Sequence, residues 1–366
     1  MIKVCHVTSV HPVFDGRIFH KECCSLAKKY DTFLVAANVE NQEVNGVHIR
    51  GVALPTTRVK RMLHIRSIIP TLINIDADVY HFHDPELIPI GSYIRRTGKK
   101  VVFDSHEDTP LLIKCKLWIP KIFRSGVSWV YFRFEKKHLS RYDAIVSVTP
   151  HIVDRLKKIN SNTYQITNYQ IYSEGEDKRQ WQRKVCFAGL LSPNWNFDKI
   201  IPALFGTDVS FELAGPSFPD SLKAKLISLK GWENVHYLGQ IPHSAVKSLI
   251  QQCSVGLALE SYDNPNAAYK LGSLGVTKLF EYMAAGVPVI CTDLVLWKQV
   301  IEEAQCGICV NPYSIEEIKN AINYLLDNPE IAKKMGDNGI KAVREKYNWA
   351  TQEVELFRMY DKILKA

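Results

Sequence analysis

The sequence predicts an α/β protein with two doubly wound parallel sheets, and three observations support this fold class. Short runs rich in β-branched residues, such as KKVVFDSH at 99–106, alternate with helical patterns such as FHKECCSLAKKY at 19–30. This alternation stops at the polar stretch YSEGEDKRQWQRK (172–184) and resumes with VCFAGLL at 185–191. A length of 366 residues is sufficient for two domains with separate cores.

The order of these runs predicts the domain organisation. We expect a Rossmann-like domain over 1–171, a linker over 172–184 and a second Rossmann-like domain over 185–345. Apolar residues at helical spacing predict a long closing helix over 346–366, which we expect to pack back on the N-terminal domain. The expected strands of the first domain lie at 2–10, 32–39, 78–84, 99–106 and 143–149, and those of the second at 185–191, 209–216, 235–239, 253–260, 287–292 and 306–312.

Composition limits the class of partner. Residues 1–184 hold 29 Lys and Arg against 18 Asp and Glu, so the net charge of +8 comes from the first half of the chain. We find no nucleic-acid-binding signature there, so an anionic membrane face or a phosphorylated substrate suits this basic half better than nucleic acid. The opening residues lack a secretory signal, no apolar run spans a bilayer, and nine scattered cysteines favour a reducing compartment. We therefore expect a cytoplasmic protein, with any membrane contact peripheral and on the inner face.

The stretch GVTKLFEYMAAGVPVI (275–290) carries the most informative polar residues. A helix is expected over 276–285, ending at Gly286 and starting at the carboxyl edge of the second sheet, where α/β proteins bind ligands. Thr277, Lys278 and Glu281 lie on the side opposite its apolar face. Lys278 could neutralise a diphosphate while Glu281 accepts hydrogen bonds from sugar hydroxyls. A solvated helix face with a local ion pair is the equally weighted alternative.

Histidines and carboxylates gather at the ends of two strands of the first domain. HFHD (81–84) and DSHED (104–108) end at the same sheet edge, so we expect His81, His83, Asp84, His106 and Glu107 to converge. Three interpretations are open: substrate contact, structural hydrogen bonding and, least favoured, a metal site, because His81 and His83 on one strand face do not define a ligand geometry.

The first loop, FDGRIFH (14–20), offers two readings of equal weight. Arg17 is either a phosphate contact or the partner of an Asp15 that caps the following helix.

Basic and aromatic residues alternate over 111–139, in LLIKCKLWIPKIFRSGVSWVYFRFEKKHL, and a second basic run follows 56–66. Such a helix pair suits the interface of an anionic bilayer. Packing of the aromatic residues on the sheet is the alternative, because one helix of this domain must cover it.

Several motifs in order resemble one enzyme family. HPVFDGRIFHKECCSLAKKY, DVYHFHDPELIPIG, VVFDSHEDTP, CFAGLLSP, VHYLGQIP and GVTKLFEYMAAGVPVI together are similar to the retaining glycosyltransferases of family 4, which have the GT-B fold. This resemblance covers nearly the whole chain. It implies a nucleotide-diphosphate sugar donor (UDP or GDP) bound mainly by the C-terminal domain and a saccharide or lipid-linked acceptor on the N-terminal domain, in cell-surface polysaccharide synthesis such as capsule, lipopolysaccharide or exopolysaccharide.

The resemblance also implies roles for individual residues. His106 corresponds to a histidine beside the donor sugar that orients and stabilises, with Glu107 assisting. Donor binding is implied for Glu281, Lys278, Thr277 and Ser273 and for the glycines Gly275, Gly189 and Gly239. From their positions in the first loop and at a strand end, we also expect acceptor or phosphate contact by Arg17, Asp15, His83 and Asp84. No metal and no other cofactor are expected, and the absence of G-x-G-x-x-G agrees with a donor that is not a dinucleotide.

This sequence departs from the family pattern at two points. The family has two glutamates eight positions apart, and Ser273 occupies the position of the first. Leu190 and Trp195 in GLLSPNWN replace a usual Arg/Lys pair, which leaves Lys278 and Lys270 to contact the diphosphate. Two other functions therefore stay open: a GT-B sugar-nucleotide 2-epimerase, which needs no acceptor, and a non-catalytic GT-B scaffold. The basic first half favours the transferase, because an epimerase has no evident need of a membrane face.

Overall fold

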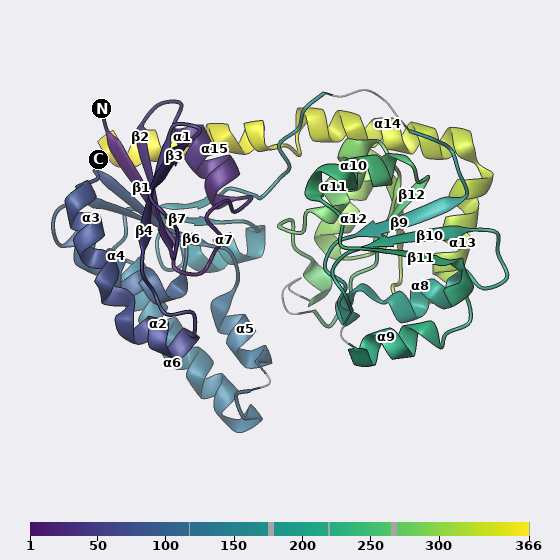
Figure 1. The fold of residues 1–366 in the computed structure, drawn as a ribbon, viewed down its shortest axis with the longest axis horizontal. Helices are drawn as coiled ribbons and strands as arrows, with labels where there is room; N and C mark the ends of the chain where they lie inside the picture. Colours follow the sequence, from purple (N-terminus) through teal and green to yellow (C-terminus); the bar gives the residue numbers. More distant parts are fainter. Residues whose placement is uncertain (117, 175–178, 219, 265–268, 366) are drawn as a thin grey trace. The chain divides into compact units, whose positions relative to one another are not determined.

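The computed structural model describes residues 1–116, 118–174, 179–218, 220–264 and 269–365, and it consists of two compact units (Figure 1). The first unit is Met1–Asn168 with Trp349–Ala366, and the second is Tyr169–Asn348. The predicted linker falls inside the second unit, and its residues 175–178 lie outside the described part of the chain.

The first unit contains an eight-stranded sheet in the order β3-β4-β2-β1-β5-β6-β7-β8. All neighbouring strands pair in parallel except β3, which is antiparallel to β4 at the edge. The strands are β1 (Lys3–Val7), β2 (Asp31–Ala37), β3 (Gln42–Val44), β4 (Val47–Val52), β5 (Val79–Phe82), β6 (Lys100–Ser105), β7 (Ala144–Ser147) and β8 (Thr163–Gln165). The predicted parallel α/β class is confirmed here.

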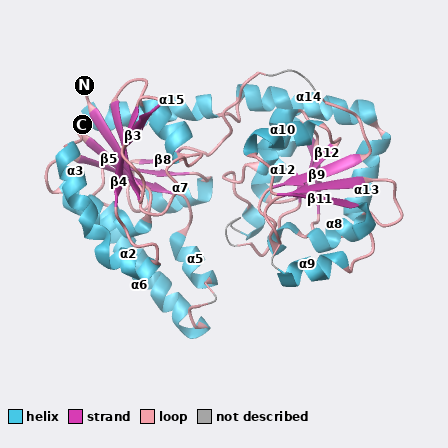
Figure 2. Ribbon diagram, viewed as in Figure 1, coloured by secondary structure: helices cyan, strands magenta, loops and turns pink. Residues whose placement is uncertain are grey.

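Helices cover both faces of this sheet (Figure 2). One face packs on η2 (Ile65–Ile68), α3 (Ile69–Ile75), α4 (Ile88–Arg95), α6 (Lys121–Leu139) and α7 (Pro150–Lys157). The other face packs on η1 (Ile18–Cys23), α1 (Cys24–Leu26) and the closing helix α15 (Trp349–Lys365). Strand alternation decides which side chain goes where: Cys5 and Val7 join the first layer, while Val4 and His6 face the second.

The second unit contains a six-stranded parallel sheet in the order β11-β10-β9-β12-β13-β14. Its strands are β9 (Lys184–Ala188), β10 (Ser210–Ala214), β11 (Val235–Gly239), β12 (Val255–Ala258), β13 (Val289–Thr292) and β14 (Gly307–Val310). Its helices are α8 (Phe197–Ala203), α9 (Asp220–Ile227), α10 (His243–Gln251), α11 (Lys278–Ala285), α12 (Val295–Ala304), α13 (Ile315–Asp327) and α14 (Pro329–Glu345).

Close packing fixes α11 against this second sheet. A Cβ at Gly256 of β12 would lie 2.3 Å from the ring of Tyr282, so glycine leaves the space that this tyrosine occupies. The Tyr282 hydroxyl donates a hydrogen bond to the carbonyl of Leu257 at 3.1 Å. At its C-terminal end α11 is closed by Gly286, which has a φ of +76° and adopts the left-handed conformation, as predicted.

Two shorter helices, α2 (Arg58–His64) and α5 (Thr109–Cys115), complete the first unit with α6. Among the described residues, no helix combines the length and the apolar character needed to cross a membrane.

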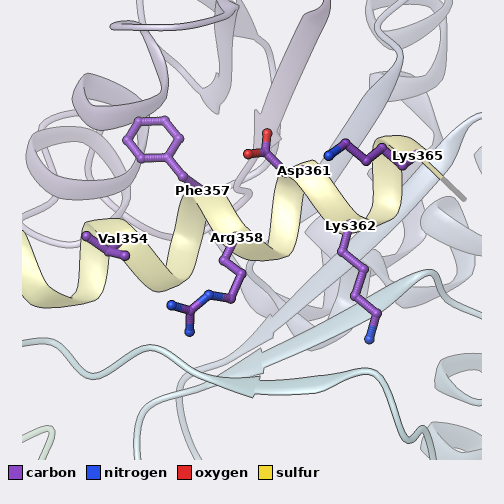
Figure 3. A pocket seen from close by; sticks show the side chains of 6 residues that line it. All are labelled: Val354, Phe357, Arg358, Asp361, Lys362 and Lys365. Carbon is purple, nitrogen blue, oxygen red and sulfur yellow. The ribbon is translucent and has the colours of Figure 1, made fainter.

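A shallow surface hollow lies along α15, where Phe357 and Asp361 leave the helix on one side and Arg358 and Lys362 on the other (Figure 3). None of the predicted site residues lines this hollow, and we assign no ligand to it.

Candidate functional site

Three glycines end neighbouring strands of the second sheet at its carboxyl edge. The Gly189 amide donates to the carbonyl of Ala214 at 2.9 Å, and the Gly215 amide donates to that of Gly239 at 2.8 Å. A Cβ at Gly215 would lie 2.0 Å from the Gly189 carbonyl oxygen, so the backbones approach more closely than other residues allow. Gly189 has a φ of +150° and Gly239 a φ of +68°, which also favour glycine. The result is an edge with little side-chain cover.

Lys278 begins α11 beside this glycine edge. A Cβ at Gly189 would lie 1.9 Å from Lys278 Nζ, and Nζ also lies 4.9 Å from the ring centre of Phe187 and 5.2 Å from that of Trp195. Burial lowers the pKa of Lys278, and the carboxylates of Glu281 and Glu260 partly offset this effect. The ammonium group is therefore a poorly solvated cation at the carboxyl edge, which suits contact with an anion.

Glu281 lies one turn further along α11 and is held by two neighbours. Its Oε1 accepts hydrogen bonds from Thr277 Oγ1 at 2.8 Å and from Gln170 Nε2 at 3.1 Å. The structure thus brings together Thr277, Lys278 and Glu281, and it adds Gln170, which sequence reasoning missed because it lies 111 residues away. The remaining lone pairs of a carboxylate held this way can accept from ligand hydroxyls.

Ser273 and Gly275 lie in the loop before α11, where Ser273 forms hydrogen bonds within the protein. Ser273 is buried, its Oγ accepts from the Gly275 amide at 3.1 Å, and its carbonyl accepts from Trp297 Nε1 at 2.9 Å. Both hydrogen bonds fix the loop. Lys270 lies with Nζ 4.9 Å from the ring centre of Tyr262, and the adjacent residues 265–268 lie outside the described chain.

The two departures from the family pattern occupy different environments. Leu190 is exposed at 68%, whereas Trp195 is buried and tilts against Phe187 with ring centres 5.1 Å apart. Trp195 therefore belongs to the core, and its ring lies beside the Lys278 ammonium group. Neither residue supplies positive charge, so Lys278 is the cation that the structure places at this edge among the predicted donor residues.

Glu260 is a further buried carboxylate near Lys278 that the sequence did not single out. It follows β12, its Oε1 accepts from Asn264 Nδ2 at 2.5 Å, and its Oε2 has no hydrogen-bond partner among the described residues. Burial raises the pKa of Glu260 to about 7, although Asn264 and the charge of Lys278 act in the opposite direction. The position after the apolar run GLAL is the signal that could have identified it.

This raised pKa predicts a pH-dependent stability. The folded state binds the Glu260 proton more tightly than the unfolded state does. Protonation of Glu260 therefore adds fully to the free energy of unfolding below the pKa that Glu260 has in the unfolded chain, and this contribution is lost as pH rises through about 7. Between pH 5 and pH 8 we expect wild type to lose roughly 2 kcal/mol relative to Glu260→Gln. Denaturant unfolding at the two pH values measures this difference, and the same pH dependence in both proteins would contradict it. The control is Glu302→Gln, which changes an exposed side chain of α12.

In the first unit, His106 follows β6 and is partly exposed. Its Nε2 lies 3.2 Å from Asp104 Oδ2 and 3.3 Å from His83 Nδ1, and its ring centre is 5.0 Å from that of His11. Asp104 is fully buried, and the charges of Arg17 and His106 hold its pKa well below the usual value despite the burial. A buried carboxylate thus orients the imidazole, an arrangement typical of functional histidines. Glu107 is exposed, and its carbonyl accepts from Ser105 Oγ at 3.0 Å.

The expected convergence of strand-end residues occurs only in part. His81 and His83 are buried at 0% and 2% exposure and stack with ring centres 4.8 Å apart. Asp84 is buried at 3%; its Oδ2 accepts from the Ser9 amide at 2.6 Å and from Thr8 Oγ1 at 2.9 Å. Both side chains have internal partners, since His83 Nε2 lies 2.9 Å from His6 Nδ1, and acceptor contact by His83 and Asp84 stays a prediction.

In the first loop, Arg17 and Asp15 both contact other residues of the first unit. Arg17 is buried at 4%, with Nε 2.7 Å from Asp104 Oδ2, Nη1 2.8 Å from the Ile166 carbonyl and Nη2 3.1 Å from Glu22 Oε1. Asp15 Oδ1 accepts from the amides of Arg17 and Ile18 at 2.8 and 2.9 Å, as a helix-capping residue does. Arg17 thus forms internal ion pairs, as in the structural interpretation, and its partners are Asp104 and Glu22 instead of Asp15. Phosphate contact by Arg17 stays a prediction.

Comparison with protein families decides the class. The model of the glycosyl transferases group 1 matches residues 169–342, and that of the glycosyl transferase 4-like domain matches residues 25–166. The chain belongs to this glycosyltransferase family. Together the two matches cover both units of the glycosyltransferase, and the predicted resemblance is confirmed.

Individual relatives are distant but extend over most of the chain. A phosphatidyl-myo-inositol mannosyltransferase of Mycobacterium leprae is 24% identical over 307 residues, which is 80% of this glycosyltransferase and 75% of the relative. A D-rhamnosyltransferase of Pseudomonas aeruginosa is 24% identical over 287 residues, or 74% and 70% of the two chains.

Solved structures share the fold. Sucrose-phosphate synthase from Thermosynechococcus elongatus matches with a TM-score of 0.79 at 14% identity and covers 100% of both chains. HepE of Anabaena in complex with UDP-glucose matches with a TM-score of 0.69 at 14% identity, over 99% of this chain and 100% of HepE. The two parallel sheets of this glycosyltransferase therefore form the GT-B fold, as predicted.

Proposed function

We propose that this glycosyltransferase moves a sugar, with retention of configuration, from a UDP or GDP sugar to a saccharide or lipid-linked acceptor in cell-surface polysaccharide synthesis. The observation that carries the proposal is the cluster at the start of α11, where Lys278 Nζ occupies the space beside Gly189 and Glu281 lies one turn away. A cation and a hydroxyl-accepting carboxylate at a carboxyl sheet edge match the two parts of a nucleotide sugar.

Donor binding would use groups of opposite charge. The Lys278 ammonium, aided by backbone amides at the glycine edge, would hold the diphosphate, and Glu281 would accept from ribose hydroxyls. Ser273, already bonded to the Gly275 amide, would offer its hydroxyl hydrogen to the sugar. With Leu190 in place of a usual arginine, phosphate neutralisation depends on Lys278 more than in the family pattern.

The transfer step assigned to the first unit centres on His106. In front-face transfer, the acceptor hydroxyl attacks the anomeric carbon while the bond to the leaving phosphate breaks, and that phosphate takes the hydroxyl proton. His106, oriented by Asp104, would hold and stabilise the transferred sugar as positive charge develops on it. No metal is required in this proposal, since Lys278 and backbone amides neutralise the leaving diphosphate.

The comparisons support this class of donor and acceptor. HepE was solved in complex with UDP-glucose, and WaaG, which matches with a TM-score of 0.70, is described as a glycosyltransferase involved in lipopolysaccharide biosynthesis. The mycobacterial relative is named for a lipid acceptor, phosphatidyl-myo-inositol. A hexose donor and a lipid-linked or saccharide acceptor are consistent with these names.

A thermal-shift screen tests donor binding without knowledge of the acceptor. Purified protein is heated with UDP, GDP, CDP and ADP and their common sugar conjugates, without added metal. A ligand that binds the folded state raises the melting temperature with affinity and concentration, so one nucleotide series should stand out. No shift with any of them would instead favour the non-catalytic scaffold, in which Ser273, Leu190 and Trp195 replace binding residues.

We also propose that the glycosyltransferase binds an anionic bilayer through an apolar patch formed by exposed side chains of α6, of Trp118 before α6 and of α2. Its members are Trp118 (70% exposed), Ile122 (81%), Phe123 (59%), Trp129 (61%) and Val130 (59%) with Val59 (71%) and Leu63 (75%) on α2. Arg58 lies 5.9 Å above the Trp118 ring, and exposed lysines such as Lys121 and Lys60 border the patch. Exposed aromatic and aliphatic side chains among basic residues match an anionic membrane interface, which supports the proposal of peripheral binding at the inner face.

Charge placed in this patch should weaken membrane binding. The double variant Ile122→Glu/Trp129→Glu is expected to reduce binding to vesicles of phosphatidylcholine with phosphatidylglycerol at least about tenfold, through lost apolar contact and added repulsion. Vesicle co-sedimentation measures this, and the control is Val354→Glu, which changes an exposed side chain of α15. Unchanged binding, or equal binding of wild type to neutral vesicles, would contradict the proposal.

A further inference from the structure

Two neighbouring strands and one helix of the first unit place four metal-ligating side chains together. His6 of β1 pairs with His81 of β5 in register, and strand alternation puts His83 on the same face as His81. Glu22 comes from η1, which packs on this face. Sequence reasoning did not group His6 and Glu22 with His81 and His83, because the pairing of β1 with β5 joins residues 75 positions apart.

The distances between the four side chains suit a small cation. His6 Nδ1 lies 2.9 Å from His83 Nε2, and Glu22 Oε2 lies 3.7 Å from the first atom and 3.8 Å from the second. One donor atom from each of the four side chains lies within 4.8 Å of the others. Ligand atoms around a tetrahedral zinc ion are about 3.3 Å apart, since zinc–nitrogen and zinc–oxygen bonds are about 2 Å long. Small side-chain shifts would therefore complete the coordination.

Burial makes an empty cluster unfavourable. His6, Glu22 and His81 have 0% exposure and His83 has 2%. Among the described residues, neither Glu22 Oε2 nor His81 Nε2 has a hydrogen-bond partner, and the ion pair with Arg17 involves the other carboxylate oxygen of Glu22. A buried carboxylate oxygen and a buried ring nitrogen that lack partners are destabilising unless another group binds them.

The outer ring nitrogens have the partners that metal-bound histidines require. Tyr360 Oη lies 3.0 Å from His81 Nδ1 and 3.2 Å from His6 Nε2, so it can accept from both rings. His83 Nδ1 lies 3.5 Å from Asp104 Oδ2 and 3.3 Å from His106 Nε2. Such contacts can hold the outer nitrogens as N–H donors. The inner nitrogens are then unprotonated, and the 2.9 Å contact between His6 Nδ1 and His83 Nε2 would be replaced by bonds to a shared cation.

We propose that His6, Glu22, His81 and His83 bind one divalent transition-metal ion, with zinc the best match to three imidazoles and one carboxylate. The four ligands leave no open position, so the ion stabilises the first unit and takes no part in sugar transfer. The proposal does not depend on the proposed function, and it differs from the expectation of a metal-free enzyme only in adding a structural ion.

Metal content is the first measurement. Protein expressed in zinc-supplemented medium and purified without chelator should contain about one zinc per chain by plasma mass spectrometry, as expected for a closed structural site. His81→Gln should contain less than about a fifth of that, and His138→Gln, which changes a histidine bonded to Ser92 in the same unit, should keep the wild-type content. Wild-type protein without zinc that also gains none on refolding with zinc would overturn the proposal.

Stability and spectroscopy cover the case in which a ligand variant fails to fold. Because the ligands are buried, wild type is unfolded, stripped with a chelator and refolded with or without zinc. We expect the zinc-refolded protein to melt at a higher temperature, and cobalt in place of zinc to give the intense visible absorption of a tetrahedral site. Equal melting temperatures and no cobalt absorption would overturn the proposal. Neither measurement requires a substrate.

Discussion

Replacing Glu281 with alanine is expected to weaken nucleotide-sugar binding about 10- to 100-fold, because a charged hydrogen-bond acceptor contributes about 1.5–3 kcal/mol. The carboxylate is already held by Thr277 and Gln170, so its position does not have to be ordered when ligand binds. Titration calorimetry with the nucleotide sugar selected by the thermal-shift screen measures the loss directly.

Two further variants separate binding from folding at this position. Glu281→Gln keeps the size and one acceptor oxygen, and it should retain part of the affinity. Glu302→Ala on α12 removes an exposed glutamate paired with Lys298 at 3.7 Å and should leave affinity unchanged. An alanine variant that binds as tightly as wild type, or one that no longer folds, would assign Glu281 a structural role only.

Replacing His106 with alanine should have the second large effect, on turnover instead of affinity. If His106 stabilises the transferred sugar as charge develops, its removal should lower kcat about 100-fold or more while the donor Kd changes less than about threefold. Steady-state kinetics together with donor titration measure the two quantities separately.

The surroundings of His106 provide the controls. His64→Ala changes an exposed histidine on α2 whose Nδ1 lies 2.8 Å from the Lys60 carbonyl oxygen, and it should leave kcat unchanged. His106→Gln can keep the contact with Asp104 at 3.2 Å and should be less impaired than the alanine variant. An equal loss of kcat and affinity, or no loss of kcat, would remove His106 from the transfer step.

Local patterns predicted much of the second unit. The helical period after Val276, the left-handed Gly286 and the apolar run that becomes β13 are all determined within a few residues, so the placement of Lys278 and Glu281 at a helix start followed from sequence alone. The strand rhythm likewise predicted both parallel sheets.

Non-local contacts explain what sequence reasoning missed. Asp104 sits inside an apolar strand and meets Arg17 across 87 residues, and Gln170 reaches Glu281 across 111. The burial of Arg17 depends on the packing of η1 over the sheet, which no local pattern specifies. The histidine cluster in the structure includes His6, which the expected cluster did not. The pairing of His6 with His81 depends on the strand order of the whole sheet, which no local pattern specifies.

Direct detection of glycosyl transfer tests the proposal that this protein moves a sugar from a nucleotide sugar to an acceptor. The protein is incubated with the radiolabelled nucleotide sugar that it binds and with bacterial membrane lipids or oligosaccharides as acceptors. We expect that label moves to a lipid or saccharide product, that one nucleoside diphosphate is released per sugar transferred, and that the new linkage keeps the donor's anomeric configuration. Release of a free, altered sugar in the absence of any acceptor would establish the epimerase reaction instead, and no consumption of a nucleotide sugar that binds would contradict catalysis altogether.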